Sequence, residues 1–86
     1  MSTVEDRLEH TILDLTAARG PAKSICPSEA ARAVGDDGWR DLMEPARAIA
    51  RELAKQGRVV VTSRGEVLSP DEEWRGPIRI GAAPAE

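Results

Sequence analysis

The stretch WRDLMEPARAIARELAKQ, residues 39–56, is followed at once by Gly57 and by the apolar run Val59–Val61. At about 100° per residue, its apolar and basic side chains separate to opposite sides of a helix. The apolar side contains Leu42, Ala46, Ile49, Ala50 and Leu53, and the basic side contains Arg40, Arg47, Arg51 and Lys55, with Glu44 among them. The stretch therefore predicts a helix that packs on a core, carries a basic outer side, and leads directly into a strand.

Pro45 lies within this stretch and allows two arrangements. A proline inside a helix removes one backbone hydrogen bond and clashes with the carbonyl group four residues earlier. One arrangement is a single helix over 39–56 that bends at 41–45. The other is a short helical turn at 39–43, followed by a helix that starts at Glu44. We favour the single bent helix, with Gly57 at its end.

A first helix is predicted over about residues 3–19, because apolar residues recur there at helical spacing until Gly20-Pro21. A capping box can form at its start, either between Ser2 and Glu5 or between Thr3 and Asp6. The lone His10 on this helix has no histidine or cysteine nearby in the sequence. We therefore interpret it as a surface residue rather than a metal ligand.

A second helix is predicted over about residues 27–34. Pro27 suits the first helical position, and Glu29 can reach back to the amide group of Cys26. Gly35 supplies a left-handed stop. The next residues, Asp36–Gly38, predict a turn in which Asp37 caps the following helix.

The remaining sequence predicts short strands joined by turns and loops. The strands are a brief one within 22–25, one at 58–62 that is rich in β-branched residues, its return at 67–68 after a turn at 63–66, and a last one at 76–80. Residues 69–73 are predicted to form a polar loop, and residues 81–86 a flexible tail. The order is helix, short strand, helix, turn, helix, then two or three strands. This order predicts an α+β fold, mainly α, of the winged helix-turn-helix type. A three-helix bundle would not account for the apolar, strand-like segments 59–61 and 78–80.

The composition favours one small folded domain over residues 1–86. The chain is 41% hydrophobic and 31% charged, with two aromatic residues, both tryptophan. No apolar run approaches the roughly 20 residues of a membrane span, and the acidic, polar start is not a signal peptide. A single cysteine cannot form an internal disulfide, which fits the reducing cytoplasm. We expect a cytoplasmic protein without a membrane anchor.

Three segments resemble a family of small bacterial proteins of unknown function. They are ICPSEAARAVG (25–35), WRDLMEPARAIARELAKQGRVVVT (39–62) and RGPIRI (75–80), and the similarity extends over roughly residues 8–80. The pairing of CPSE with RGPIR carries the resemblance. It implies a winged-helix fold without defining an activity. Winged helices generally bind DNA, and a sizeable minority bind proteins, so function is argued here by analogy of fold.

Double-stranded DNA is the partner that we predict for residues 39–56 and for the wing around 63–66. Arg40, Arg47 and Arg51 would reach phosphates or guanine edges, Lys55 would contact the backbone, and Arg64 would enter the minor groove. Arg75 or Arg79 could also reach the backbone. The net charge of −3 and the acids Asp36, Asp37 and Asp41 at the leading end of the helix oppose this.

A protein-interaction module is the alternative hypothesis. The acidic first helix and the segment DEEWR (71–75) would suit a basic or apolar partner, although Trp74 could instead fold back over the sheet. We expect no enzyme, because the chain has no glycine-rich phosphate loop and no paired Cys/His spacing; no cofactor, metal or catalytic residue is predicted. We interpret Cys26 as a small buried residue rather than a redox or metal sensor. The sequence does not define the oligomeric state.

Overall fold

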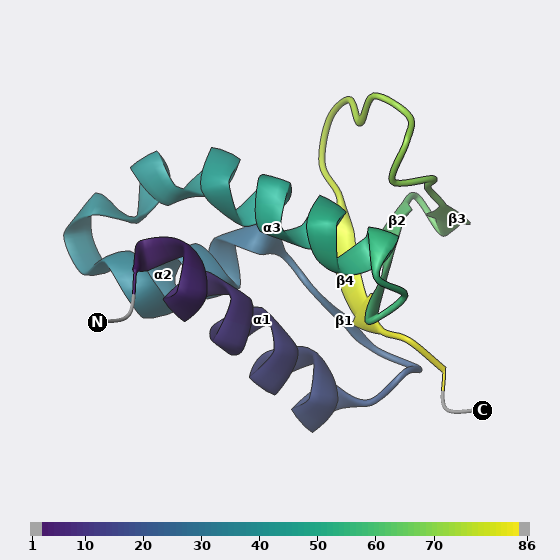
Figure 1. Ribbon diagram of the computed structural model, residues 1–86, viewed down its shortest axis with the longest axis horizontal. Helices are drawn as coiled ribbons and strands as arrows, with labels where there is room; N and C mark the ends of the chain where they lie inside the picture. The colour runs from purple at the N-terminus through teal and green to yellow at the C-terminus, as the bar shows by residue number, and fades with distance from the viewer. Residues whose placement is uncertain (1–2, 85–86) are drawn as a thin grey trace.

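The structure is a computed structural model and describes residues 3–84. Figure 1 shows a mainly helical α+β chain in which the helices lie on one side of a small sheet. In chain order the elements are α1 (Val4–Arg19), β1 (Ser24–Ile25), α2 (Pro27–Gly35), the 3₁₀-helix η1 (Asp36–Leu42), α3 (Met43–Lys55), β2 (Val59–Ser63), β3 (Glu66–Val67) and β4 (Arg79–Ala82). None of the helices among the described residues is long and apolar enough to cross a membrane.

The four strands form one antiparallel sheet in the order β1-β4-β2-β3. The last strand of the chain therefore lies in the interior of the sheet, between β1 and β2. Ile80 shows this directly, because it faces Ile25 on one side and Val61 on the other. This arrangement holds the end of the chain against the segment that follows α1.

The core lies between the helices and the sheet. Leu8 and Ile12 of α1, Leu53 of α3, and Ile80 of β4 are completely buried. The predicted strand at 58–62 corresponds to β2, in which Val59 and Val61 point inward and Val60 is half-buried between them. Aliphatic side chains supply nearly all of this core, and Trp74 is its one aromatic member.

Side chains cap the first two α-helices in the way that the sequence predicts. At α1, Thr3 and Asp6 exchange hydrogen bonds in a capping box. At α2, the Glu29 carboxylate accepts from the Cys26 amide at 2.9 Å. Each contact satisfies a donor that a helix start leaves without a partner. The other predicted capping residue, Ser2, lies outside the described residues.

The single bent helix over 39–56 is wrong, and the alternative arrangement is closer to the structure. α3 begins at Met43, and Pro45 lies in its first turn, where a missing N–H group leaves no helical bond unmade. The preceding seven residues form η1, which also includes the predicted turn at 36–38. Asp37 consequently lies inside η1 and does not cap the next helix.

The left-handed stop predicted at Gly35 is also wrong. Gly35 has φ −102°, and the positive φ of 48° belongs to the next residue, Asp36. A Cβ atom at position 35 would lie 2.6 Å from Cδ1 of Leu42, so a larger residue there would require the Leu42 side chain to move. The close packing of η1 on α2 therefore favours glycine at this position.

The last strand lies further along the chain than predicted. β4 covers Arg79–Ala82 rather than 76–80, so Gly81 and Ala82 belong to the sheet and not to a flexible tail. Gly81 pairs with both Ser24 and Val60, and Ala82 pairs with Val59. Small residues carry little strand signal, but neighbouring strands on both sides hold this segment. Residues 85–86 of the predicted tail lie outside the described residues.

Candidate functional site

The exposed side of α3 is the surface on which the sequence places most of its candidate binding residues. Ala46, Ala50 and Leu53 are buried in the core. The opposite side presents Glu44, Ala48, Glu52 and Lys55 to solvent, with Arg47 and Arg51 half-buried beside them. The predicted basic side therefore exists, but its two central arginines are partly covered.

The loop between β3 and β4 (residues 68–78) covers these two arginines. Arg47 donates from Nη1 to the carbonyl oxygen of Gly76 and from Nη2 to that of Trp74, both at 3.0 Å. Arg51 donates from Nη1 to the carbonyl oxygens of Pro70 and Glu72, the latter at 2.8 Å. Both side chains thus fasten the loop to α3 through its backbone.

Trp74 completes this attachment. The residue is only 8% exposed, its Nε1 donates to the carbonyl oxygen of Ser69 at 2.8 Å, and the guanidinium carbon of Arg51 lies 4.2 Å from the ring centroid. A guanidinium group over an indole face is attracted by the ring quadrupole. Trp74 is therefore folded back into the protein rather than presented to a partner.

The charges of Arg47 and Arg51 have no acidic partner within the described part of the chain. Their hydrogen-bond acceptors are carbonyl groups, which carry no net charge, and no carboxylate among residues 3–84 lies within 4.0 Å of either guanidinium group. The two positive charges are consequently fixed in position and left uncompensated at close range.

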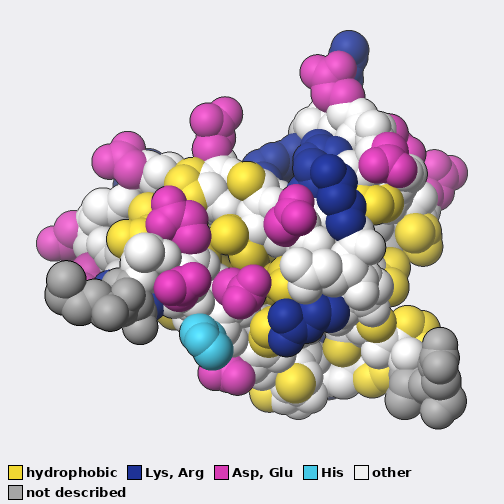
Figure 2. Space-filling view, in the orientation of Figure 1, with side chains coloured by type: hydrophobic (Ala, Val, Ile, Leu, Met, Phe, Trp, Pro, Cys, Tyr) yellow, Lys and Arg dark blue, Asp and Glu magenta, His cyan; other side chains and the backbone are white. Residues whose placement is uncertain are grey.

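A groove lies beside these charges, between α3 and the β3–β4 loop. It has a volume of about 520 Å³ and is lined by Glu44, Pro45, Arg47, Ala48, Arg51, Glu73 and Trp74. Figure 2 shows basic side chains gathered beside this loop, with acidic side chains distributed around them. The groove therefore combines two cations, two acids and an apolar floor.

The other three candidate residues lie apart from this pair. Arg40 is exposed on η1, with its guanidinium carbon 4.7 Å from the centroid of Trp39, which Arg32 also approaches to 4.4 Å. Lys55 is exposed at the last position of α3, and Arg64 is exposed at the tip of the β2–β3 hairpin with φ 53°. The five predicted residues thus lie on η1, in the middle and at the end of α3, and on the hairpin.

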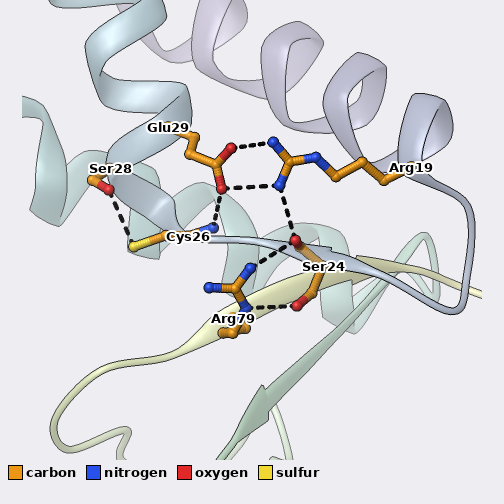
Figure 3. Close-up of polar contacts among 6 residues, drawn as sticks. All are labelled: Arg19, Ser24, Cys26, Ser28, Glu29 and Arg79. Atoms are coloured by element: carbon orange, nitrogen blue, oxygen red, sulfur yellow. Dashed lines mark hydrogen bonds and ion pairs between the residues drawn. The ribbon is translucent and has the colours of Figure 1, made fainter.

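A second arginine pair, which sequence reasoning missed, joins four elements (Figure 3). Arg19 forms a two-pronged ion pair with Glu29 and donates to the carbonyl oxygen of Ser24 at 3.0 Å. Arg79 donates to the same carbonyl oxygen at 2.8 Å and to the Ser24 hydroxyl at 2.6 Å. The cluster links α1, β1, α2 and β4. The pairing of CPSE with RGPIR is the only sequence signal for it.

The ion pair perturbs both partners. Hydrogen bonds from Arg19 and from the Cys26 amide hold the pKa of Glu29 below its usual value, although partial burial opposes this. The hydrogen bond to Glu29 in turn raises the pKa of Arg19. Both groups are therefore charged at neutral pH.

The family model described as "Protein of unknown function (DUF3253)" matches residues 5–83. The chain belongs to this family. The resemblance to a family of undefined function is thereby confirmed, and no curated protein matches the chain. The family itself assigns no role to any of the arginine clusters.

The remaining candidate residues show no organised chemistry. Cys26 is partly exposed rather than buried, and the Ser28 hydroxyl donates to its sulfur atom at 3.1 Å. His10 is exposed on α1, as predicted. Within residues 3–84, no three His, Cys, Asp or Glu side chains gather in a way that could hold a metal ion.

Proposed function

We propose that the protein is a winged helix-turn-helix module that binds double-stranded DNA through α3 and the β2–β3 hairpin. The observation that carries the proposal is the position of α3. It follows α2 through the short η1, buries one side in the core, and directs a basic side outward next to a hairpin with Arg64 at its tip. Helix-turn-helix proteins place their second helix of this motif in the major groove in the same way.

The candidate residues divide into two roles. Arg40, Lys55 and Arg64 are exposed and contact phosphate groups. Arg47 and Arg51 hold the β3–β4 loop beside the helix, and their charges add to the local positive potential. The sequence analysis predicts DNA contacts for all five residues. Arg47 and Arg51 differ from the other three because they already have carbonyl partners in the protein.

The acids near the start of α3 limit the affinity. Asp36, Asp37 and Asp41 are exposed on η1, and Glu44 is exposed on α3. They repel phosphate at the end of the motif that approaches the groove. With three phosphate contacts, the logarithm of the binding constant falls with the logarithm of salt concentration with a slope of about −3. Binding is therefore modest and requires low salt.

Fluorescence anisotropy with a labelled duplex tests this proposal. Arg64→Gln weakens binding and reduces the salt slope by about 1. Arg7→Gln, on the exposed side of α1, is the matched control because it changes the net charge equally. Equal effects of the two variants, or no binding at low salt and about 50 μM protein, would refute DNA binding through this face.

A protein-interaction module is the second candidate, and one observation favours it. Val67 on β3 is 72% exposed, and it borders a groove of about 360 Å³ in which no charged side chain is found among the described lining residues. Exposed apolar patches often mark protein contacts. A photo-crosslinking residue in place of Val67 would yield a defined protein adduct that the same substitution at Arg7 does not yield; equal labelling at both positions would exclude the patch.

A further inference from the structure

We propose that the groove between α3 and the β3–β4 loop binds a small aromatic carboxylate. The carboxylate lies against Arg51 and Arg47, and the ring lies on Pro45 and Ala48, beside the nearly buried Trp74. The groove lies on the side of α3 proposed to face DNA, but the inference does not rest on DNA binding, and neither the family nor the fold assigns this ligand. The inference depends on the size of the groove, the free donors of one arginine, and the charges around it.

The size and lining of the groove suit a small molecule. Its volume of about 520 Å³ falls in the range of about 300–1,000 Å³ typical of ligand sites. Ligand sites combine apolar walls with a few converging polar groups. Here Pro45 and Ala48 supply the apolar wall, and the two guanidinium groups supply the polar groups.

Arg51 has the donors that a carboxylate requires. A guanidinium group carries five N–H donors in a fixed plane. Within the described chain, the hydrogen bonds of Arg51 use only Nη1, which leaves Nε and Nη2 for another acceptor. These two nitrogens form one edge of the plane, the geometry that binds a carboxylate through two parallel hydrogen bonds. Stacking on Trp74 and the bonds to the loop fix that edge in advance.

The charges around the groove favour a monoanion. Arg47 and Arg51 have no carboxylate within ion-pair distance among residues 3–84, so an incoming carboxylate gains a partner without displacing one. Glu44 and Glu73 also line the groove. Together with the two arginines they leave the lining with no net charge, so a single carboxylate at Arg51 is favoured over a dianion, whose second charge would also lie near the acids. The apolar wall then selects an aromatic acid over acetate.

An NMR titration with 2-naphthoate tests the proposal, with 2-naphthamide as the neutral control and no DNA present. Naphthoate shifts the amide signals of residues 44–51 and 72–76 and saturates at millimolar concentration or below, whereas naphthamide shifts them at least about fivefold less at equal concentration. Shifts scattered over the surface, or equal shifts with both compounds, would overturn the proposal. Because DNA is absent, failure of DNA binding does not affect this result.

Two variants keep the test independent of folding. Ala48→Glu adds a third negative charge to the groove at an exposed helical position and leaves in place Arg47 and Arg51, which bind the loop. It weakens naphthoate binding by at least about fivefold. Ala17→Glu, exposed on α1, carries the same charge change and leaves binding unaltered. Equal affinity of the two variants would place the ligand elsewhere and overturn the proposal.

Discussion

Two arginine pairs bind backbone carbonyl groups within residues 3–84, and in this part of the chain only one of the pairs has an acidic partner. Arg19 and Arg79 converge on the carbonyl oxygen of Ser24, and Glu29 lies beside them in an ion pair with Arg19. Arg47 and Arg51 bind four carbonyl groups of the β3–β4 loop, with no carboxylate among the described residues close enough to pair. Arginine side chains thus have an acidic partner in one cluster, whereas in the other their partners among the described residues are carbonyl groups.

The difference separates a structural cluster from a candidate site. In the first cluster, one carboxylate compensates Arg19, and the contacts join the end of α1 to β1, α2 and β4. In the second, the loop satisfies several donors but leaves both charges uncompensated beside an open groove. Charged side chains held in place beside an apolar groove are a feature of ligand sites.

Removing the Arg51 guanidinium group should have the largest effect on stability. Arg51→Gln loses two hydrogen bonds from a charged donor and the contact with the Trp74 ring, so we expect a loss of about 2–3 kcal/mol in the free energy of unfolding. Urea titration measures the loss. Trp74 emission should shift to the red as the loop loosens.

Arg51→Lys is the informative control. It keeps the charge but lacks the planar fork, so it should recover less than half of the lost stability. Full recovery by lysine would show that charge alone holds the loop. The division of roles among the α3 arginines would then be wrong.

Removing the charge of Glu29 should have a smaller effect, because the ion pair is partly exposed. Glu29→Gln loses the ion pair with Arg19 and weakens the bond to the Cys26 amide. We expect a loss of about 1 kcal/mol, similar to the loss of a helix cap. A loss larger than that of Arg51→Gln would reverse the ranking of the two clusters.

The effect of Glu29→Gln should also depend on pH. The pKa of Glu29 is lowered in the folded protein, so its charge stabilises the fold fully above the unfolded pKa of about 4.3. That stabilisation is lost as the pH falls through the folded pKa. The difference in unfolding free energy between the wild type and Glu29→Gln should therefore be constant near neutral pH and shrink below about pH 4. An unchanged difference at pH 3 would contradict this assignment.

The sequence predicts the local features of both clusters but not their long-range contacts. The caps at Thr3 and Cys26 follow from residues three positions apart, and periodicity locates the buried side of α3. Arg51 instead binds carbonyl groups some 20 residues away in a loop without regular structure. Backbone carbonyls are present at every position, so no residue type marks them as partners. The basic side of α3 is therefore predictable, whereas its partial coverage is not.

The errors in the predicted secondary structure have the same origin. Gly35 and Pro45 have strong local preferences, which predict a left-handed stop and a bend. Packing of Leu42 against Gly35 and the new helix start at Met43 give both residues other roles. Likewise, Gly81 and Ala82 join the sheet because β1 and β2 flank them. In each case a tertiary contact overrides a local signal.

The smallest expected effect is the dependence of the two stability losses on salt concentration. The Arg19–Glu29 pair is partly exposed, so dissolved ions screen it. The stability lost in Glu29→Gln should therefore fall by roughly a few tenths of a kcal/mol between about 0.05 and about 1 M NaCl. The contacts of Arg51 join a charge to dipoles at short range, and the loss in Arg51→Gln should change less. Urea titrations of both variants and the wild type at each salt concentration measure this difference. If the loss in Arg51→Gln shrinks as much as that in Glu29→Gln, then an acid near the groove, such as Glu44 or Glu73, already compensates Arg51, and the contrast between the two clusters disappears.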